Sequence, residues 1–200
     1  MDGDRDSLAR ALLPLDAPPA GPGWNHADMA DLLGESPRAP AAVMLGFRDD
    51  RQQRLVLTVR THTLSDHAGQ VALPGGRVDE GDANVVDAAL REAEEEIGLH
   101  RTAVRPLGFL DRYETISGFV ITPVVARIDA AARLHPAPGE VAEIFEVPLD
   151  FLVDPANLRR YTMDYRGHRR DMVEFVHAGH RIWGATAAIV LNLLRRMGHA

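Results

Sequence analysis

Four glutamates stand within five consecutive positions of one predicted helix: Glu92, Glu94, Glu95 and Glu96. Like charges three or four residues apart destabilise a helix by roughly a few tenths of a kcal/mol per pair, and a cation bound between the carboxylates would offset that cost. Carboxylate oxygens suit Mg²⁺ or Mn²⁺, and Mg²⁺ is commonly held by carboxylates together with substrate phosphates. The run therefore indicates metal-assisted chemistry on a phosphate compound, although a solvated acidic helix face would show the same residues.

The helix that carries these glutamates is predicted to run over residues 83–97. Asp82 is a plausible N-cap, and Gly98 stands where a glycine commonly ends a helix. On a repeat of 3.6 residues per turn, Glu92, Glu95 and Glu96 fall on one stripe, while Glu94 points toward solvent. An adjacent apolar stripe would pack the helix against a core, and it consists of Val86, Ala89, Leu90, Ala93 and Ile97.

The wider pattern resembles the Nudix box, the signature G-x5-E-x7-R-E-U-x-E-E-x-G-U, in which U is a bulky apolar residue. Gly76 begins the pattern, and residues 91–99, REAEEEIGL, supply its second half. The sequence departs from the signature in three respects. Asp82 replaces the first glutamate, one extra residue separates it from the arginine, and Ala93 is small for its apolar position.

The segment before the box resembles the signature of one Nudix branch, the coenzyme A pyrophosphatases: L-L-T-x-R-[SA]-x3-R-x3-G-x3-F-P-G-G. Ser65 stands where that signature has its second arginine, which removes a fixed cation with five donors. Segments 115–125, 140–149 and 182–187 also resemble this branch. The positions that agree with the upstream signature are Leu57, Thr58, Arg60, Gly69, Pro74, Gly75 and Gly76.

The Nudix resemblance implies a site. Glu92 and Glu96 would be the principal ligands of Mg²⁺ or Mn²⁺, with Glu95 as a third ligand and the Gly76 carbonyl as a fourth. The general base could be Glu92 itself or a glutamate on a distant loop, for which this chain offers Glu140 and Glu143. Arg60, at a position of the branch signature, could bind a substrate phosphate or pair with an acidic neighbour. His67 could donate to a phosphate or make a local hydrogen bond, and Gly75 fits a loop whose backbone approaches a charged ligand.

Bulk properties are those of a small enzyme with one domain. The chain has 200 residues, 46% of them hydrophobic, which is enough for a sizeable core. It lacks cysteine, so disulfides and thiol nucleophiles are excluded. A net charge of −7 argues against nucleic-acid binding. Because no apolar run approaches the length of a membrane span and no signal pattern begins the sequence, we expect a cytoplasmic protein without membrane contact.

The order of predicted elements favours an α/β fold. Residues 1–39 read as an N-terminal extension with short helices at 7–13 and 26–33, and residues 40–197 as the Nudix domain. The resemblance implies an α/β/α sandwich with a mixed β-sheet. The predicted strands are 41–47, 54–60, 105–114, 119–128, 143–148, 160–165 and 170–177, and an apolar helix is predicted at 184–197.

The function that these patterns predict is divalent-metal-dependent hydrolysis of the pyrophosphate linkage of coenzyme A or an acyl derivative. The products would be 4′-phosphopantetheine, or its acyl form, and adenosine 3′,5′-bisphosphate. Ser65 favours an alternative substrate of the same class, such as ADP-ribose or NADH. A rival of another class is a non-catalytic Nudix domain that senses nucleotides. The expected partner is a small nucleotide, and a homodimer is an assembly that the resemblance allows.

Overall fold

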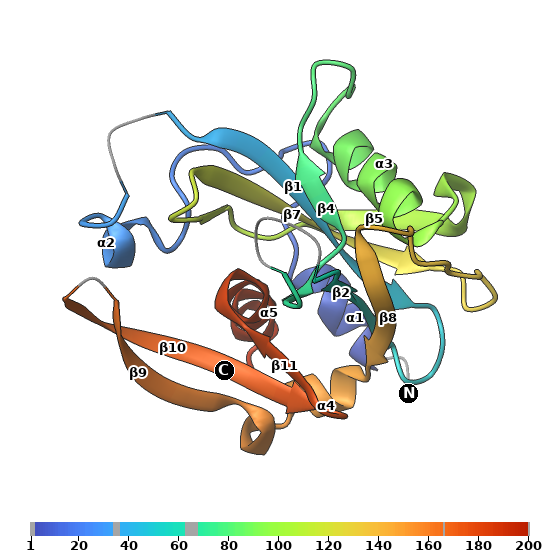
Figure 1. The fold of residues 1–200 in the computed structure, drawn as a ribbon. Helices are drawn as coiled ribbons and strands as arrows, with labels where there is room; N and C mark the ends of the chain where they lie inside the picture. Colours follow the sequence, from blue (N-terminus) through green and yellow to red (C-terminus); the bar gives the residue numbers. More distant parts are fainter. Residues whose placement is uncertain (1–2, 34–36, 63–67, 166, 200) are drawn as a thin grey trace.

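The computed structural model describes residues 3–33, 37–62, 68–165 and 167–199. An eight-stranded sheet is built around β1 (Ala39–Arg48), as Figure 1 shows. β1 pairs in parallel with β7 (Phe119–Ile128) along its whole length. The other described pairings of this sheet are antiparallel, so the sheet is mixed. Its remaining strands are β2 (Leu55–Arg60), β3 (Val71–Ala72), β4 (Gly75–Arg77), β5 (Val104–Phe109), β6 (Tyr113–Glu114) and β8 (Val141–Val147).

Helices cover both faces of this sheet because successive side chains of a strand point to opposite sides. Met44 of β1 packs in an apolar layer with α3 (Val85–Ile97). The next residue, Leu45, packs in a second layer with α5 (Gly184–Arg196) on the other face. The arrangement confirms the predicted α/β/α sandwich with a mixed sheet. No helix among the described residues is long and apolar enough to cross a membrane.

A second, three-stranded antiparallel sheet lies beside α5 (Figure 1). The predicted hairpin is present as β9 (Arg159–Tyr165) and β10 (His168–His177). β11 (His180–Trp183) was not predicted, because four residues with two basic side chains give no strand periodicity. Ile182 of β11 is fully buried in the α5 layer. The short connecting elements are α4 (Leu149–Val153), η1 (Arg101–Ala103) and η2 (Pro155–Asn157).

The segment before β1 packs on the rest of the chain. Helix α1 (Gly3–Arg10) places Leu8, fully buried, in the α5 layer. Leu13 then exchanges two backbone hydrogen bonds of 2.9 Å with Phe109 at the end of β5. After α2 (His26–Met29) the chain enters β1. The domain boundary at residue 39 stays a prediction, while the apolar core draws side chains from both sides of it.

Candidate functional site

The acidic helix α3 begins two residues later than the Asp82 cap predicts. Asn84 is the N-cap: its side-chain oxygen accepts hydrogen bonds from the backbone amides of Val86 at 2.9 Å and Asp87 at 3.1 Å. Gly98 ends the helix as expected, with a left-handed φ of 63°. The Asp82 prediction is wrong because a different partner, Arg91, takes its carboxylate.

The turn before α3 needs glycine at two positions. Gly75 has φ of 154°, and a β-carbon there would lie 2.3 Å from the carbonyl oxygen of Ala42. A β-carbon on Gly76 would lie 2.6 Å from the carboxyl carbon of Glu92. Since any side chain at 75 would strike backbone and any at 76 would strike Glu92, the two glycines let the strand pass directly beneath the carboxylates.

Glu92 and Glu96 share the helix face that lies against this turn. The Gly75 amide donates a hydrogen bond of 3.1 Å to Oε2 of Glu96. The side chain of Glu96 is 7% exposed, and burial, together with the charge of Glu92, raises its pKa to about 7. Burial also raises the pKa of Glu92, although its neighbour Arg91 opposes that shift. Both groups are therefore costly to ionise without a cation beside them.

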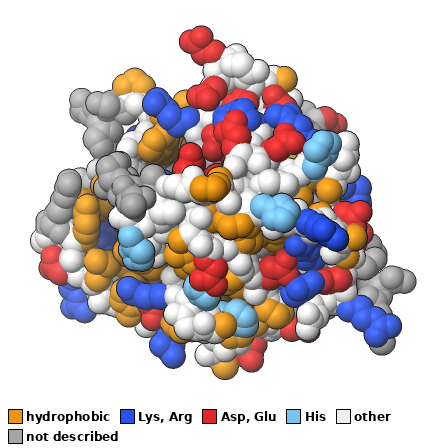
Figure 2. Space-filling model, turned by 45° about the vertical axis from the view of Figure 1, so that its right-hand side comes forward, with side chains coloured by type: hydrophobic (Ala, Val, Ile, Leu, Met, Phe, Trp, Pro, Cys, Tyr) orange, Lys and Arg blue, Asp and Glu red, His pale blue; other side chains and the backbone are white. Residues whose placement is uncertain are grey.

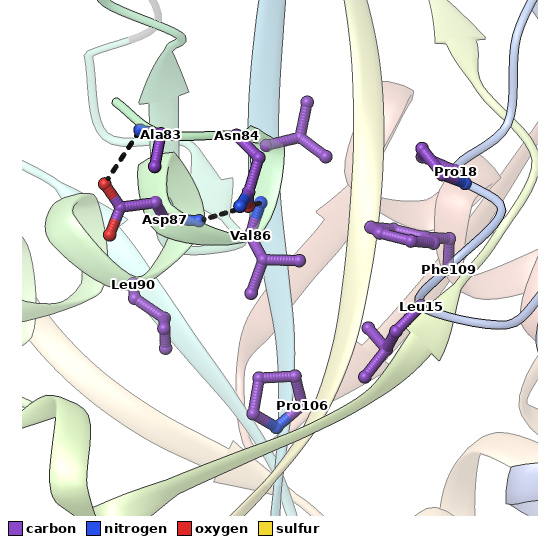
Figure 3. A pocket seen from close by; sticks show the side chains of 10 residues that line it. Leu15, Pro18, Ala83, Asn84, Val86, Asp87, Leu90, Pro106 and Phe109 are labelled. Carbon is purple, nitrogen blue, oxygen red and sulfur yellow. Dashed lines mark hydrogen bonds between the residues drawn. The ribbon is translucent and has the colours of Figure 1, made fainter. Parts of the chain in front are cut away.

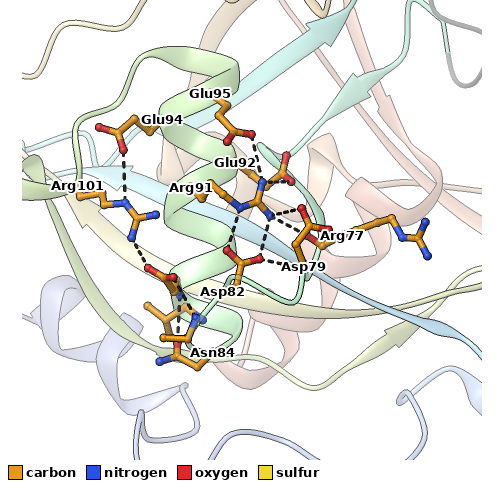
Figure 4. Close-up of polar contacts among 12 residues, drawn as sticks. Arg77, Asp79, Asp82, Asn84, Arg91, Glu92, Glu94, Glu95 and Arg101 are labelled. Atoms are coloured by element: carbon orange, nitrogen blue, oxygen red, sulfur yellow. Dashed lines mark hydrogen bonds and ion pairs between the residues drawn. The ribbon is translucent and has the colours of Figure 1, made fainter.

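Arg91 organises the acidic residues around it, as Figure 4 shows. Its guanidinium donates to both oxygens of Asp82, at 2.9 and 3.0 Å. It also contacts Glu92 at 2.8 Å and Glu95 at 3.2 Å. The side-chain hydrogen bond from Arg91 holds the pKa of Asp82 at about 2. The shared partner fixes the loop before α3 and two of the predicted site glutamates relative to one another.

Arg60, the last residue of β2, lies beside the buried end of this group. Its Nη1 is 3.9 Å from Oε1 of Glu96. Its Nε is buried and has no hydrogen-bond partner among the described residues. Because only Nη1 of Arg60 lies near Glu96, the guanidinium can still donate to an incoming phosphate. The predicted His67, like Ser65, lies outside the described residues.

The two loop glutamates have different surroundings. The loop after β7 is tied to α3, since the amides of His135 and Ala137 donate to the carbonyls at the end of that helix, each at 2.9 Å. The loop then reaches Glu140, whose carbonyl accepts a 2.9 Å bond from Thr61 and whose negative charge contributes to the raised pKa of Glu96.

Glu143 is not brought to Glu92 and Glu96. Glu143 pairs with Val59 of β2, whose side chain packs in the α5 layer. Arg60, which follows Val59 in β2, points the other way and lies near Glu96. The carboxylate of Glu143 instead lies 3.1 Å from Nε2 of His180. Strand alternation therefore separates it from the carboxylates of α3.

The residues around the turn fit a divalent cation. Glu92 and Glu96 offer hard oxygen ligands one helical turn apart, and a cation there would offset the cost of burying their charge. Glu95 is more exposed and is held by Arg91, so it would reach an ion only by leaving that contact. Among the described residues, no three histidine, aspartate or glutamate side chains already lie close enough together to hold an ion.

Two surface features frame the site. Figure 2 shows acidic and arginine side chains interleaved at the top of one face of the molecule. A groove of about 520 Å³ lies on another side of α3, against Val86 and Leu90 (Figure 3). Leu15 and Pro18 of the N-terminal segment form its opposite wall, with Phe109. Because Leu90 and Glu92 are two residues apart, about 200° around the helix, the groove is separate from the carboxylates.

Comparisons with known proteins agree with these features. The family model described as the NUDIX domain matches residues 37–166. An uncharacterised Nudix hydrolase NudL of Pectobacterium atrosepticum is 42% identical over 155 residues, covering 76% of this chain and 80% of the relative. The NudL of Photorhabdus laumondii is 38% identical over 157 residues, covering 78% and 84%. A crystal structure of a protein from Deinococcus radiodurans shares the fold, with a TM-score of 0.50 at 18% identity and coverage of 79% and 86%.

Proposed function

Because this chain belongs to the Nudix family of pyrophosphohydrolases, we propose that it hydrolyses the pyrophosphate linkage of coenzyme A or an acyl derivative. The products are 4′-phosphopantetheine, or its acyl form, and adenosine 3′,5′-bisphosphate. The observation that carries the proposal is that buried carboxylates and an arginine lie side by side at the Gly75 turn. Burial makes the carboxylate of Glu96 costly to ionise without a cation, and Arg60, 3.9 Å from Glu96, has an Nε without a hydrogen-bond partner among the described residues.

In this proposal Glu92 and Glu96 hold Mg²⁺ or Mn²⁺, and Glu95 and the Gly76 carbonyl are further ligands. A bound divalent ion neutralises phosphate charge and lowers the pKa of a water molecule. Arg60 would bind and orient a phosphate beside Glu96, because its side chain is 29% exposed and its contact with Glu96, at 3.9 Å, is longer than a hydrogen bond and leaves guanidinium N–H groups to donate. Arg91 acts as a positioning residue, because it restrains Glu92 and Glu95 without being free for substrate.

The assignment of the general base follows from the same contacts. Glu92 lies against the turn and accepts a hydrogen bond of 2.8 Å from Arg91. The negative charge of Glu140 helps to raise the pKa of Glu96, whereas Glu143 makes a 3.1 Å contact with His180. We therefore propose Glu92 or Glu140 as the base that accepts the proton of the attacking water. Glu143 is not retained in that role.

The choice of substrate within the class rests on the sequence. Agreement with the coenzyme A pyrophosphatase signature, from Leu57 to Gly76, favours the coenzyme. Ser65 in place of an arginine favours ADP-ribose or NADH as the alternative, because it removes a cation that a phosphate-rich coenzyme could use.

A hydrolysis panel read by mass spectrometry tests the proposal. It contains coenzyme A, acetyl-coenzyme A, dephospho-coenzyme A, ADP-ribose, NADH and a nucleoside triphosphate, each with Mg²⁺, with Mn²⁺ and with EDTA. We expect metal-dependent turnover with coenzyme A or its acetyl form preferred. Preference for ADP-ribose or NADH would contradict the substrate but keep the chemistry. Ligand-dependent thermal stabilisation without product would instead identify a nucleotide sensor.

A further inference from the structure

We propose that Arg77 binds the 3′-phosphate on the nucleotide half of the substrate and is a specificity-determining residue of this enzyme. The inference rests on the proposed function, because only a coenzyme A-like substrate carries that phosphate beside its pyrophosphate linkage. Arg77 directly follows Gly76 in β4, so its backbone lies next to the turn on which Glu92 rests.

The backbone of Arg77 is fixed on two sides. Residue 77 pairs with Ala41 of β1, and its carbonyl accepts a 3.0 Å hydrogen bond from Arg91. Arg91 also contacts Glu92, so one side chain links the position of Arg77 to a proposed metal ligand. A phosphate bound by Arg77 would therefore lie at a fixed place relative to the carboxylates of α3.

Strand register directs the Arg77 side chain away from α3. Gly76 pairs with Ala42, which packs in the α3 layer, so position 76 faces α3. Successive residues of a strand alternate in direction, and Arg77 therefore points to the opposite face of the sheet. Figure 4 shows the guanidinium extending away from the acidic cluster. It lies 5.9 Å from the ring centre of Phe119, which pairs with Ala39 across the other edge of β1. A flat guanidinium beside an aromatic ring is held in a restricted orientation at little cost.

The guanidinium of Arg77 can donate to a ligand. Its side chain is exposed and makes no hydrogen bond or ion pair with any residue that the structure describes. Arg91, by contrast, is surrounded by carboxylates. In a chain of net charge −7, a cation one residue from the site that has no ionic partner among the described residues can offer a bidentate contact to a phosphate. It also supplies a cation that the segment around Ser65 lacks.

Calorimetric binding of two adenine nucleotides in the presence of Mg²⁺ tests this proposal without turnover. We expect the native protein to bind adenosine 3′,5′-bisphosphate about tenfold or more tighter than adenosine 5′-monophosphate, the scale of one charge-assisted contact. Arg77→Gln should remove that preference and leave the affinity for the monophosphate unchanged, which also shows that the variant is folded. Arg77→Lys should keep part of the preference, because lysine retains the positive charge but lacks the paired N–H donors of the guanidinium.

Arg51→Gln is the matched control, since Arg51 is exposed in the turn beyond the other end of β1 and its loss changes the net charge equally. It should bind both nucleotides as the native protein does. Equal affinity of the native protein for the two nucleotides, or equal weakening of both by Arg77→Gln, would overturn the proposal. Failure of the proposed function is read separately, as absence of coenzyme A hydrolysis in the panel above.

Discussion

The amide of Gly75 donates a 3.1 Å hydrogen bond to Oε2 of Glu96, which ties the glycine turn to the last turn of α3. The bond places a carboxylate that is 7% exposed directly above the backbone that precedes the helix. Among the described residues this carboxylate has one amide donor and no salt-bridge nitrogen closer than that of Arg60 at 3.9 Å, so its ionised form is a cost to the fold. It is explained by the ligand that the site is proposed to bind.

Glu96→Gln should remove most of the activity and stabilise the metal-free protein. The pKa of Glu96 in the folded chain is about 7, above its ordinary value of 4.5, so the stability it contributes is present below that ordinary value and lost as pH rises through 7. At pH 8 in EDTA the variant should gain about 1–3 kcal/mol, which is several degrees in Tm. At pH 5 the gain should shrink.

Thermal melts of the two proteins with EDTA and with Mg²⁺ measure this effect. Mg²⁺ should raise the Tm of the native protein and leave that of the variant nearly unchanged. Turnover should fall about 100-fold or more, since a metal site supplies several kcal/mol of charge stabilisation. The control is Glu94→Gln on the same helix, whose carboxylate is 42% exposed beside Arg101. Near-native turnover by both Glu92→Gln and Glu96→Gln at saturating Mg²⁺ would contradict the site.

Asp82→Asn should destabilise the protein at neutral pH. Asp82 is 2% exposed and accepts two hydrogen bonds from Arg91, so its loss should cost about 1–3 kcal/mol. The pKa of Asp82 is lowered from 3.8 to about 2, so its contribution is present above pH 3.8 and is lost as pH falls toward 2. Urea unfolding at pH 7 and at pH 3 measures this.

Asp79→Asn is the control for that experiment, because its carboxylate is 66% exposed and 3.6 Å from Arg91. It should change stability by less than about 1 kcal/mol. If the two variants were equally stable at pH 7, Arg91 would not depend on Asp82 for its position.

Glu140→Gln should lower kcat more than Glu143→Gln. The charge of Glu140 reaches Glu96, whereas Glu143 is paired with His180 on the other face of β8. Loss of a general base costs typically about 10²–10⁴ in rate, so a tenfold difference in kcat between the variants is a low threshold. Steady-state rates against pH measure it. A larger loss of kcat in Glu143→Gln would show that the face of β8 that carries Glu143 contacts the substrate.

Leu8→Ala should destabilise the domain by about 2–5 kcal/mol, because Leu8 is fully buried in the α5 layer and its removal leaves a cavity. Leu15→Ala, at a side chain that is 45% exposed, should change stability by less than about 0.5 kcal/mol. Urea unfolding of both variants gives the comparison. Equal stabilities would mean that residues 1–39 are an appendage and not part of the cooperative unit.

The sequence by itself determined the features that depend on local spacing. Helix periodicity placed Glu92 and Glu96 one turn apart on one face, and the glycine at 98 ended the helix where a left-handed residue is needed. The order of predicted strands and helices indicated an α/β fold, and the Nudix resemblance implied the mixed sheet with helices on both faces. These follow from neighbours within a few residues, which a linear pattern contains.

Only the tertiary structure decided the relationships that depend on register and on pairing across the chain. The partner of Asp82 is Arg91, nine residues away, so its role as a helix cap could not be excluded from local rules. Strand pairing put Arg60 toward Glu96 and Glu143 toward His180, and turned Arg77 away from α3 onto Phe119. A shift of one residue in register reverses every such direction, and that register is set by packing between distant strands.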